Sequence, residues 1–213
     1  RLSTILSELV EANANQKKAA LVVLANVPKD EMEEELRVRV PETRTTRVVC
    51  RTGDPSSPAD LAMVNVRGAR SIIVLAGDEG DAGVVKAVLA VRSVDPTFAT
   101  AHVVAELDNP GHAATLRTLT DGRIVTLQAD EIIAELTAQA CHQAGLAAVF
   151  RELLDFDGDE IYFTPVPDLV GVTYRDALLA FATCSVLGWI RADGVVELNP
   201  PADATFGAGY EII

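Results

Sequence analysis

Residues 47–81, RVVCRTGDPSSPADLAMVNVRGARSIIVLAGDEGD, decide the fold that the sequence predicts. This stretch holds two short apolar, β-branched runs, at 48–50 and 71–76, with a helical segment between them. Continuous apolar runs of this length, separated by a helix, are typical of neighbouring parallel strands that are buried on both faces. Ligands of such sheets bind at the carboxyl ends of the strands, so residues 53–54 and 77–81 mark the edge where a ligand is expected.

The composition is that of an acidic globular chain. Of its 213 residues 49% are hydrophobic, and the formal net charge is −13. A sizeable core can therefore form, and a nucleic-acid partner is not expected, because phosphate binding needs clustered Lys and Arg. No apolar run reaches the length of about 18 residues that would predict a membrane span. The amphipathic first helix does not resemble a signal peptide.

Neither the cysteines nor the histidines form a recognisable catalytic or metal-binding motif. The cysteines lie far apart, without a Cys-x-x-Cys pair, and predict buried thiols in a reducing compartment. The histidines share no metal-ligand spacing with them, and no Gly-x-Ser-x-Gly elbow is present. The sequence gives no support for catalysis. The residues concerned are Cys50, Cys141, Cys184, His102, His112 and His142.

Strands and helices alternate along the first 129 residues. Expected strands cover 20–25, 47–50, 71–76, 102–107 and 123–127, with helices before, between and after them. This alternation predicts an α/β fold with a Rossmann-like, doubly wound parallel sheet. A complete nucleotide-binding half begins with a strand and a Gly-rich turn before its first helix. This chain begins inside that helix, so the first strand is expected to be missing or truncated.

The pattern changes after residue 129. Two helices, 130–144 and 146–154, form a crossover, and beyond it strands are expected at 160–163, 186–191 and 195–198, with a short helix at 174–181. Asp193-Gly194 predicts a two-residue hairpin turn between the last two strands. We therefore expect a Rossmann-like subdomain at 1–129, crossover helices at 130–159 and a small α+β subdomain at 160–213.

Several of these stretches resemble known ion-channel domains. Gly53-Asp54, the ADL at 59–61 and the AR at 69–70 that leads into SIIVLA resemble the regulator-of-K⁺-conductance family (RCK, also TrkA-N or KTN). The opening LSELVEANANQ (6–16) and residues 129–163 are similar to the cytosolic domain of the CASTOR/POLLUX ion channels and their bacterial relatives. The tail, from LVGVTYRDALLAF (169–181) to the PP at 200–201, resembles the RCK/TrkA-C subdomain.

The resemblance implies a cytosolic, ligand-sensing regulatory domain of a cation channel and not an enzyme. Members assemble as dimers and as tetrameric or octameric gating rings beneath a transmembrane pore, which would lie upstream in the same polypeptide. The crossover helices clasp a second subunit, and the domain lies at the cytoplasmic face of the membrane. Ligands of the family include Ca²⁺ and nucleotides.

Four acidic residues are the candidate metal ligands. Asp78 and Asp81 follow one predicted strand, and Glu106 and Asp108 close the next, so their carboxylates would face one another if the strands are neighbours. Ca²⁺ prefers several oxygen ligands of this type. One Ca²⁺ site of the RCK family uses an acid in the first loop and two acids one residue apart after the next strand, which Glu106 and Asp108 match. The alternative is that all four are solvated loop acids.

A nucleotide would use a different set of residues at the same ends of the strands. Asn26 stands where an acidic ribose ligand is expected, and the Gly-rich turn is absent, so both departures disfavour a dinucleotide. Gly53 and Asp54 have an alternative interpretation as a turn whose helix is capped by Asp54 or Ser57. The candidate nucleotide-binding residues are Asn26, Gly53, Asp54, Ala76 and Gly77.

Two other functions remain open from the sequence. An NAD(P)-dependent Rossmann oxidoreductase would require a Gly-rich motif upstream of Arg1 and a catalytic acid–base residue in a pocket. A ligand-free assembly scaffold would only hold the pore subunits together, and it predicts assembly without any effect of a ligand.

Overall fold

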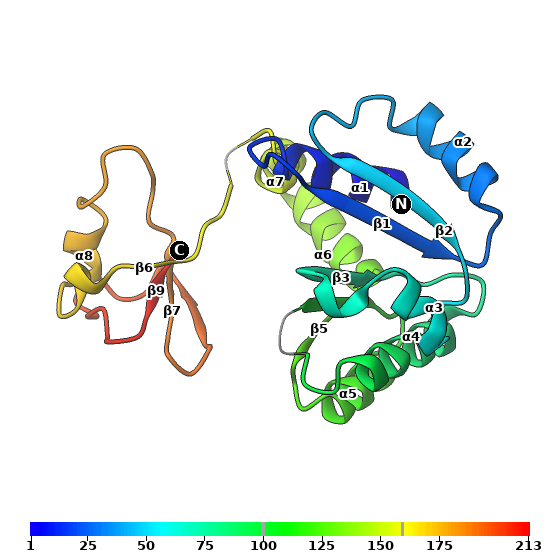
Figure 1. The fold of residues 1–213 in the computed structure, drawn as a ribbon. Helices are drawn as coiled ribbons and strands as arrows, with labels where there is room; N and C mark the ends of the chain where they lie inside the picture. The colour runs from blue at the N-terminus through cyan, green and yellow to red at the C-terminus, as the bar shows by residue number, and fades with distance from the viewer. Residues whose placement is uncertain (99–100, 159) are drawn as a thin grey trace. The chain divides into compact units, whose positions relative to one another are not determined.

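A computed structural model describes residues 1–98, 101–158 and 160–213 of the chain. These residues form two compact units, 1–151 and 152–213 (Figure 1). The predicted crossover, 130–159, therefore falls mostly within the first unit. Within the described ranges, no helix has the length and apolar character needed to cross a membrane.

The first unit confirms the predicted alternation of strands and helices. Its strands are β1 (Ala20–Ala25), β2 (Arg47–Thr52), β3 (Ser71–Val74), β4 (His102–Glu106) and β5 (Ile124–Leu127). Its helices are α1 (Leu2–Ala12), α2 (Lys29–Arg39), α3 (Pro58–Met63), the 3₁₀ turn η1 (Val66–Gly68), α4 (Gly80–Val94), α5 (Pro110–Leu119) and α6 (Ala129–His142). Helix α7 (Leu146–Leu154) contains the division between the two units.

The parallel α/β class is confirmed, but the five strands lie in two sheets. β1 pairs with β2, and β3, β4 and β5 pair in that order, all in parallel. β1 and β3 form no ladder with each other in the described part of the chain. In the doubly wound order one further parallel strand lies between the strands that correspond to β1 and β3. This is the arrangement expected when the first strand of that order is missing.

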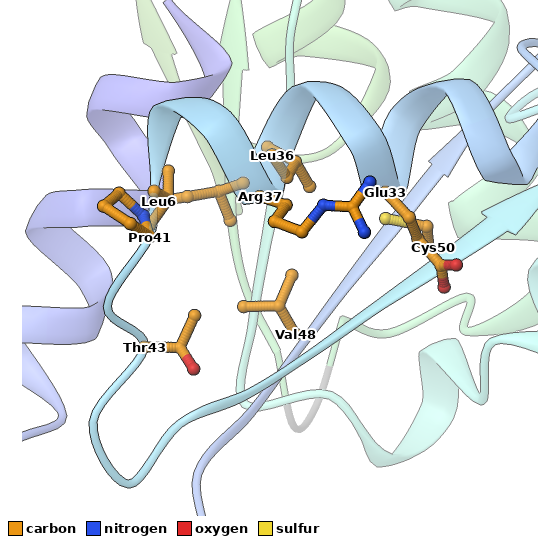
Figure 2. A pocket seen from close by; sticks show the side chains of 9 residues that line it. Leu6, Glu33, Leu36, Arg37, Pro41, Thr43, Val48 and Cys50 are labelled. Carbon is orange, nitrogen blue, oxygen red and sulfur yellow. The ribbon is translucent and has the colours of Figure 1, made fainter.

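Each parallel sheet has its own hydrophobic core. Val84, Val88 and Val91 recur at helical spacing on α4, are at most 2% exposed, and belong to one buried cluster with β4 and α5. A second cluster joins α1 and α2 to the β1–β2 pair, with Leu6 and Cys50 among its members. Both of these residues also line an open cavity (Figure 2). The cores fix the strand ends from which the candidate site is built.

The second unit is a small antiparallel α+β structure (Figure 1). The predicted hairpin is confirmed, because β7 and β8 pair in antiparallel fashion on either side of Gly194, whose φ is +83°. Its turn is longer than the two residues predicted, since the Arg191 N–H donates to the Val195 carbonyl and residues 192–194 form the loop. Its elements are β6 (Thr164–Pro165), η2 (Pro167–Leu169), α8 (Tyr174–Ala177), β7 (Gly188–Ile190), β8 (Val196–Leu198) and β9 (Glu211–Ile212), with strand order β6-β9-β7-β8.

Two predictions for the second unit were wrong in extent. Residues 160–163 form no strand, because the ladder with β9 begins only at Thr164, which pairs with Ile212. Ile161, Tyr162 and Phe163 accordingly remain 44%, 65% and 53% exposed. The helix predicted at 174–181 ends at Ala177. The two-residue strand β9 was not predicted, since so short a strand has no periodicity to read.

Trp189 is the centre of the second unit's core. It is 1% exposed and makes edge-to-face contacts with Tyr174 and Phe206, at centroid distances of 5.6 and 6.0 Å. Its Nε1 donates a hydrogen bond of 2.8 Å to Glu197 Oε2, which satisfies the polar end of the buried indole.

Replacing Phe206 with alanine should destabilise this unit. Phe206 is 2% exposed, so Phe206→Ala is expected to lower the free energy of unfolding by about 3–5 kcal/mol. Trp189 is the chain's one tryptophan, so its fluorescence during urea unfolding reports on this unit. Leu179→Ala, at a side chain 83% exposed, is the control and should change the value by less than about 0.5 kcal/mol. Equal effects of the two variants would contradict the assigned core.

Candidate functional site

The candidate residues lie at the carboxyl ends of the strands in two groups. Asn26 follows β1, and Gly53 and Asp54 follow β2, at the end of the first sheet. The second group lies at the end of the β3–β4 pair and comprises Ala76, Gly77, Asp78, Asp81, Glu106 and Asp108. The parallel pairing of β3 with β4 brings the loops after these two strands together.

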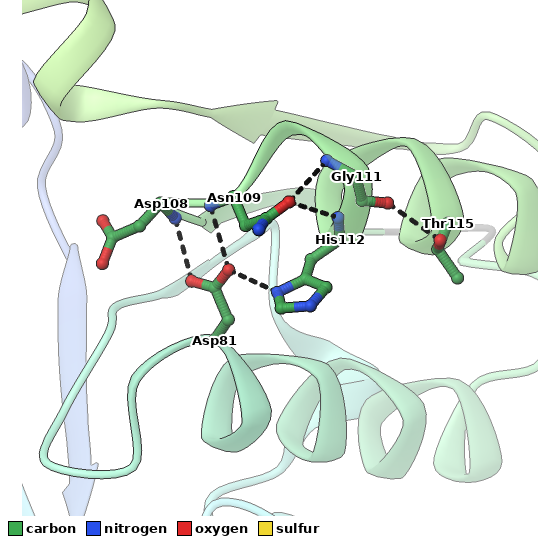
Figure 3. A network of polar contacts seen from close by, with 6 residues as sticks. All are labelled: Asp81, Asp108, Asn109, Gly111, His112 and Thr115. Carbon is green, nitrogen blue, oxygen red and sulfur yellow. Dashed lines mark hydrogen bonds and ion pairs between the residues drawn. The ribbon is translucent and has the colours of Figure 1, made fainter.

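The Asp81 carboxylate connects the start of α4 to the loop before α5 (Figure 3). Asp81 Oδ1 accepts a hydrogen bond of 2.8 Å from the Asp108 N–H, and Oδ2 accepts one of 3.0 Å from the Asn109 N–H. His112 Nδ1 lies 2.7 Å from Asp81 Oδ2. We call Asp81 with these three partners the Asp81 clamp. It brings two predicted metal ligands, Asp81 and Asp108, together through the backbone of Asp108.

The start of α5 presents these partners because of its local sequence. Asn109 is the N-cap, and its Oδ1 accepts a hydrogen bond of 2.8 Å from the Gly111 N–H and a longer one from the His112 N–H (Figure 3). Pro110 occupies the first turn, where its missing N–H leaves no donor unpaired. This cap places His112 within reach of Asp81. The sequence interpretation missed His112, although the Asn-Pro cap three residues before it predicts where α5 begins.

The hydrogen bonds of the clamp keep Asp81 ionised. Burial raises the pKa of Asp81, but the bonds from the Asp108 N–H, His112 and the Asn109 N–H more than offset this effect, and the pKa lies below the usual value for aspartate. A negative charge is therefore fixed in the first turn of α4, where the helix dipole favours it.

Glu106 is a buried carboxylate with one unsatisfied oxygen. It is the last residue of β4 and is 7% exposed. Its Oε1 pairs with the guanidinium of Arg1, while Oε2 is buried and has no hydrogen-bond partner among the described residues. A buried oxygen of this kind is the type of group that an ordered water or a cation satisfies.

The other two candidate ligands are solvent-exposed. Asp78 lies in the exposed loop after β3. The Asp108 side chain is exposed, and its carboxylate points away from Asp81 (Figure 3). Outside positions 99, 100 and 159, which are not described, no three His, Cys, Asp or Glu side chains are grouped to hold a metal. The acids share one edge of the sheet, but they are not assembled as a coordination sphere.

Gly53 and Asp54 form a closely packed turn. A Cβ on Gly53 would lie 2.9 Å from Leu24 Cδ1 and 3.2 Å from Asp60 Cβ, so any larger residue would displace these side chains. The Asp54 N–H donates to Asp60 Oδ2 at 2.8 Å, and Asp54 Oδ1 accepts from the Ser56 N–H at 2.8 Å. Ser57 is the N-cap of α3, which confirms the turn-and-cap interpretation with Ser57 as the cap.

The remaining candidate nucleotide-binding residues are more accessible to solvent than the Gly53–Asp54 turn. Asn26 is exposed at the end of β1. Gly77 is exposed after β3, and a Cβ added to it would meet no atom within 4 Å. Ala76 beside it is half-buried. The backbone at the end of β3 is therefore accessible, whereas the turn after β2 is already occupied by its own hydrogen bonds.

Comparison with known proteins finds ion channels. A family model described as "Castor and Pollux, part of voltage-gated ion channel" matches residues 130–213. Over its full length the chain is 34% identical to the probable ion channel POLLUX of Arabidopsis thaliana, 32% to that of rice (Oryza sativa subsp. japonica) and 29% to the ion channel CASTOR of Lotus japonicus. It spans 26%, 23% and 26% of these proteins, about a quarter of their length.

Two solved structures of a GsuK channel also match. One covers 92% of this chain and 36% of its own, at 14% identity and a TM-score of 0.39. The other, titled as bound to NAD, covers 100% of this chain and 35% of its own, at 16% identity and a TM-score of 0.43.

Loss of the Asp81 charge should weaken the first unit. Asp81→Asn removes a charged acceptor and one of its two acceptor oxygens, and is expected to lower the free energy of unfolding by about 1–3 kcal/mol at neutral pH. Unfolding in urea followed by circular dichroism would measure it. Asp78→Asn, in the exposed loop three residues earlier, is the matched control and should have little effect.

The stability that the Asp81 carboxylate contributes should depend on pH, and the sign of this dependence follows from the direction of its pKa shift. Because the folded-state pKa of Asp81 is lowered, its contribution is present above the unfolded-state value of about 3.9 and is lost as the pH falls through the folded-state value. The stability difference between the parent and Asp81→Asn should shrink on acidification below about pH 4. A difference that is constant with pH would show that the charge of Asp81 is not what stabilises the clamp.

Proposed function

This chain is a relative of the CASTOR and POLLUX ion channels, and from that relationship we propose that it is the ligand-sensing regulatory domain of a membrane cation channel. The observation that carries the proposal is the match to these channels along the whole chain, at up to 34% identity. The domain would lie at the cytoplasmic face of the membrane and would be connected to a pore domain of the same polypeptide. It would regulate the pore and have no catalytic activity of its own.

Such a domain acts on a pore only through differential binding. A ligand shifts the equilibrium between two arrangements of the assembly by the difference in its affinity for them. The residues that bind the ligand must therefore have different partners in the two arrangements. The Asp81 clamp and the Arg1–Glu106 ion pair are contacts that a ligand at the same edge would have to exchange for its own.

The favoured ligand is Ca²⁺, held by Glu106 and Asp108 with Asp78 or Asp81. The unsatisfied Oε2 of Glu106, at the carboxyl end of β4, supports a cation there. The pairing of β4 with β3 supports ligands from both loops, since Ca²⁺ takes six to eight oxygens in a flexible geometry. Binding through Asp81 would replace its hydrogen bonds to His112 and to the α5 N-terminus.

A nucleotide is the second candidate ligand. The exposed, unobstructed backbone at Gly77 supports it, because phosphates bind where backbone N–H groups can be approached closely. Asn26, Gly53, Asp54 and Ala76 would form the rest of that site. Titration with NAD and ATP beside the cations tests this alternative.

Calcium titration of the purified chain, stripped of metal by a chelator, is the direct test. Isothermal titration should show saturable heat with Ca²⁺ and a much weaker response to Mg²⁺. Glu106→Gln should weaken Ca²⁺ binding at least about tenfold, because one charged ligand is lost. Glu31→Gln, at an exposed acid of α2, carries the same charge change and should bind like the parent. Flat Ca²⁺ traces would leave a ligand-free assembly role or the nucleotide.

Helices α6 and α7 support assembly with a second copy of the chain. Neither helix contains a buried residue in the single chain. Ile132, Ile133 and Val149 are 42%, 56% and 51% exposed although they are large and apolar. Burial of such side chains in a partner is favourable at about 25 cal/mol per Å². We therefore propose a homodimer through these helices, extended to a tetrameric or octameric ring when the chain is tethered to its pore.

Size-exclusion chromatography with light scattering tests the dimer. The parent should have the mass of two chains, and Ile133→Glu should shift it to one, because a carboxylate would be buried unpaired in the interface. Val38→Glu introduces the same charge at a side chain of α2 that is 75% exposed, and should remain dimeric. A parent of single-chain mass, or dissociation by both variants, would refute the α6–α7 interface.

A further inference from the structure

An open cavity of about 230 Å³ lies between α1, α2 and β2 (Figure 2). Its lining comes from α1, α2, the loop after α2 and β2, and includes neither Gly53 nor Asp54. The regulatory site proposed above makes no use of this cavity.

The floor of the cavity is apolar. It includes Leu6, Leu36, Val40 and Cys50, which are 4%, 9%, 7% and 2% exposed. Burial, and after it the charge of Glu33, raises the pKa of the Cys50 thiol, so this sulfur is neutral at physiological pH. A floor of this kind accepts an apolar group, because contact with it removes apolar surface from water.

The rim carries a cation without a partner. Arg37 lines the cavity, and among the residues that the structure describes it has no hydrogen bond or ion pair. Its neighbours on α2 are paired, Glu33 with Lys29 at 3.4 Å and Arg39 with Glu35 at 3.2 Å. Figure 2 shows the Arg37 side chain extended beside the lining side chains of α2 and above Val48.

The sequence is basic from Arg37 to Arg51 but acidic over the first part of α2, where residues 29–36 contain five acids and one lysine. Residues 37–51 contain five arginines and a single acid, Glu42, in a chain of net charge −13. Arg44 is paired with Glu11, and Arg39 with Glu35, which still leaves this segment net positive. Of the two charged side chains in the cavity lining, Glu33 is paired with Lys29, so Arg37 is the one whose charge is not neutralised by an ion pair among the described residues. The arginines are Arg37, Arg39, Arg44, Arg47 and Arg51.

We propose that this cavity binds a small aliphatic carboxylate, with its tail on the apolar floor and its carboxylate on Arg37. A guanidinium pairs with a carboxylate through two parallel hydrogen bonds, which a neutral head group cannot reproduce. An apolar cavity of about 150 Å³ holds benzene, so about 230 Å³ suits eight or nine non-hydrogen atoms, the size of hexanoate. The proposal is independent of the regulatory function.

Titration of the ¹⁵N-labelled chain with hexanoate, followed by NMR, tests the proposal. Saturable shifts are expected at the amides of Val48 and Cys50, which line the cavity. Arg37→Gln should raise the Kd for hexanoate about tenfold or more. Arg39→Gln, on the same helix but outside the cavity lining, carries the same charge change and should leave the Kd unchanged.

Hexan-1-ol and a cavity-filling variant complete the test. The alcohol should bind the parent more weakly than hexanoate does, and equally to the parent and Arg37→Gln. Val48→Phe should abolish the hexanoate shifts while thermal melting shows that the chain is folded; if it does not fold, the Arg37 and Arg39 variants decide alone. Equal binding of acid and alcohol, equal effects of the two arginine variants, or no shifts at Val48 and Cys50 would each overturn the proposal.

Discussion

The Asp81 carboxylate accepts hydrogen bonds from the Asp108 and Asn109 N–H groups and lies within 2.7 Å of His112, and the carboxyl edge of the second parallel sheet depends on these contacts. They join two segments almost thirty residues apart, the first turn of α4 and the first turn of α5. The ladder between β3 and β4 and the buried cluster of α4, β4 and α5 hold the two segments in the same unit, and the Asp81 contacts connect their loops directly. The backbone of Asp108 is held by this connection, whereas Glu106 is placed by the ladder of β4 with β5.

The same carboxylate cannot hold the clamp and coordinate a cation through both oxygens at once. This exclusion is one way to give a ligand different affinities for two arrangements, and only such a difference changes their populations. Glu106 would also have to give up a contact to coordinate a cation through both oxygens, since Oε1 pairs with Arg1 while Oε2 has no partner among the described residues. Stability of the edge and affinity for a cation would therefore oppose each other, and a residue that supports one weakens the other.

Local sequence patterns predicted most of the fold. The apolar runs predicted all five parallel strands, the Asp193-Gly194 turn predicted the β7–β8 hairpin, and Ser57 was one of the two residues proposed as the cap of α3. The wrong strand at 160–163 and the missed β9 have one cause. Whether two or three residues form a strand depends on a partner from elsewhere in the chain, which no local periodicity records.

The candidate site was predicted only in its location. Parallel strands put their carboxyl ends at one edge, so the sequence sufficed to place Asp78, Asp81, Glu106 and Asp108 there. It did not predict that Asp81 would bind the backbone of Asp108, or that Asp108 would point away (Figure 3). His112 lies 31 residues from Asp81, and such a pair leaves no signal in spacing or composition.

Helix α1 contacts both of the sites that the structure suggests. Arg1 pairs with Glu106 at the carboxyl edge, and Leu6, little more than one turn later, lies in the floor of the cavity beside Cys50. A ligand that displaces Arg1 and a ligand that fills the cavity would therefore act on the same helix. Coupling between two sites is reciprocal, so any effect of the anion on cation affinity would equal the effect of the cation on anion affinity. Coupling through α1 would differ from zero only if the helix has two positions that both ligands bias, which is the physical condition for a coupling path.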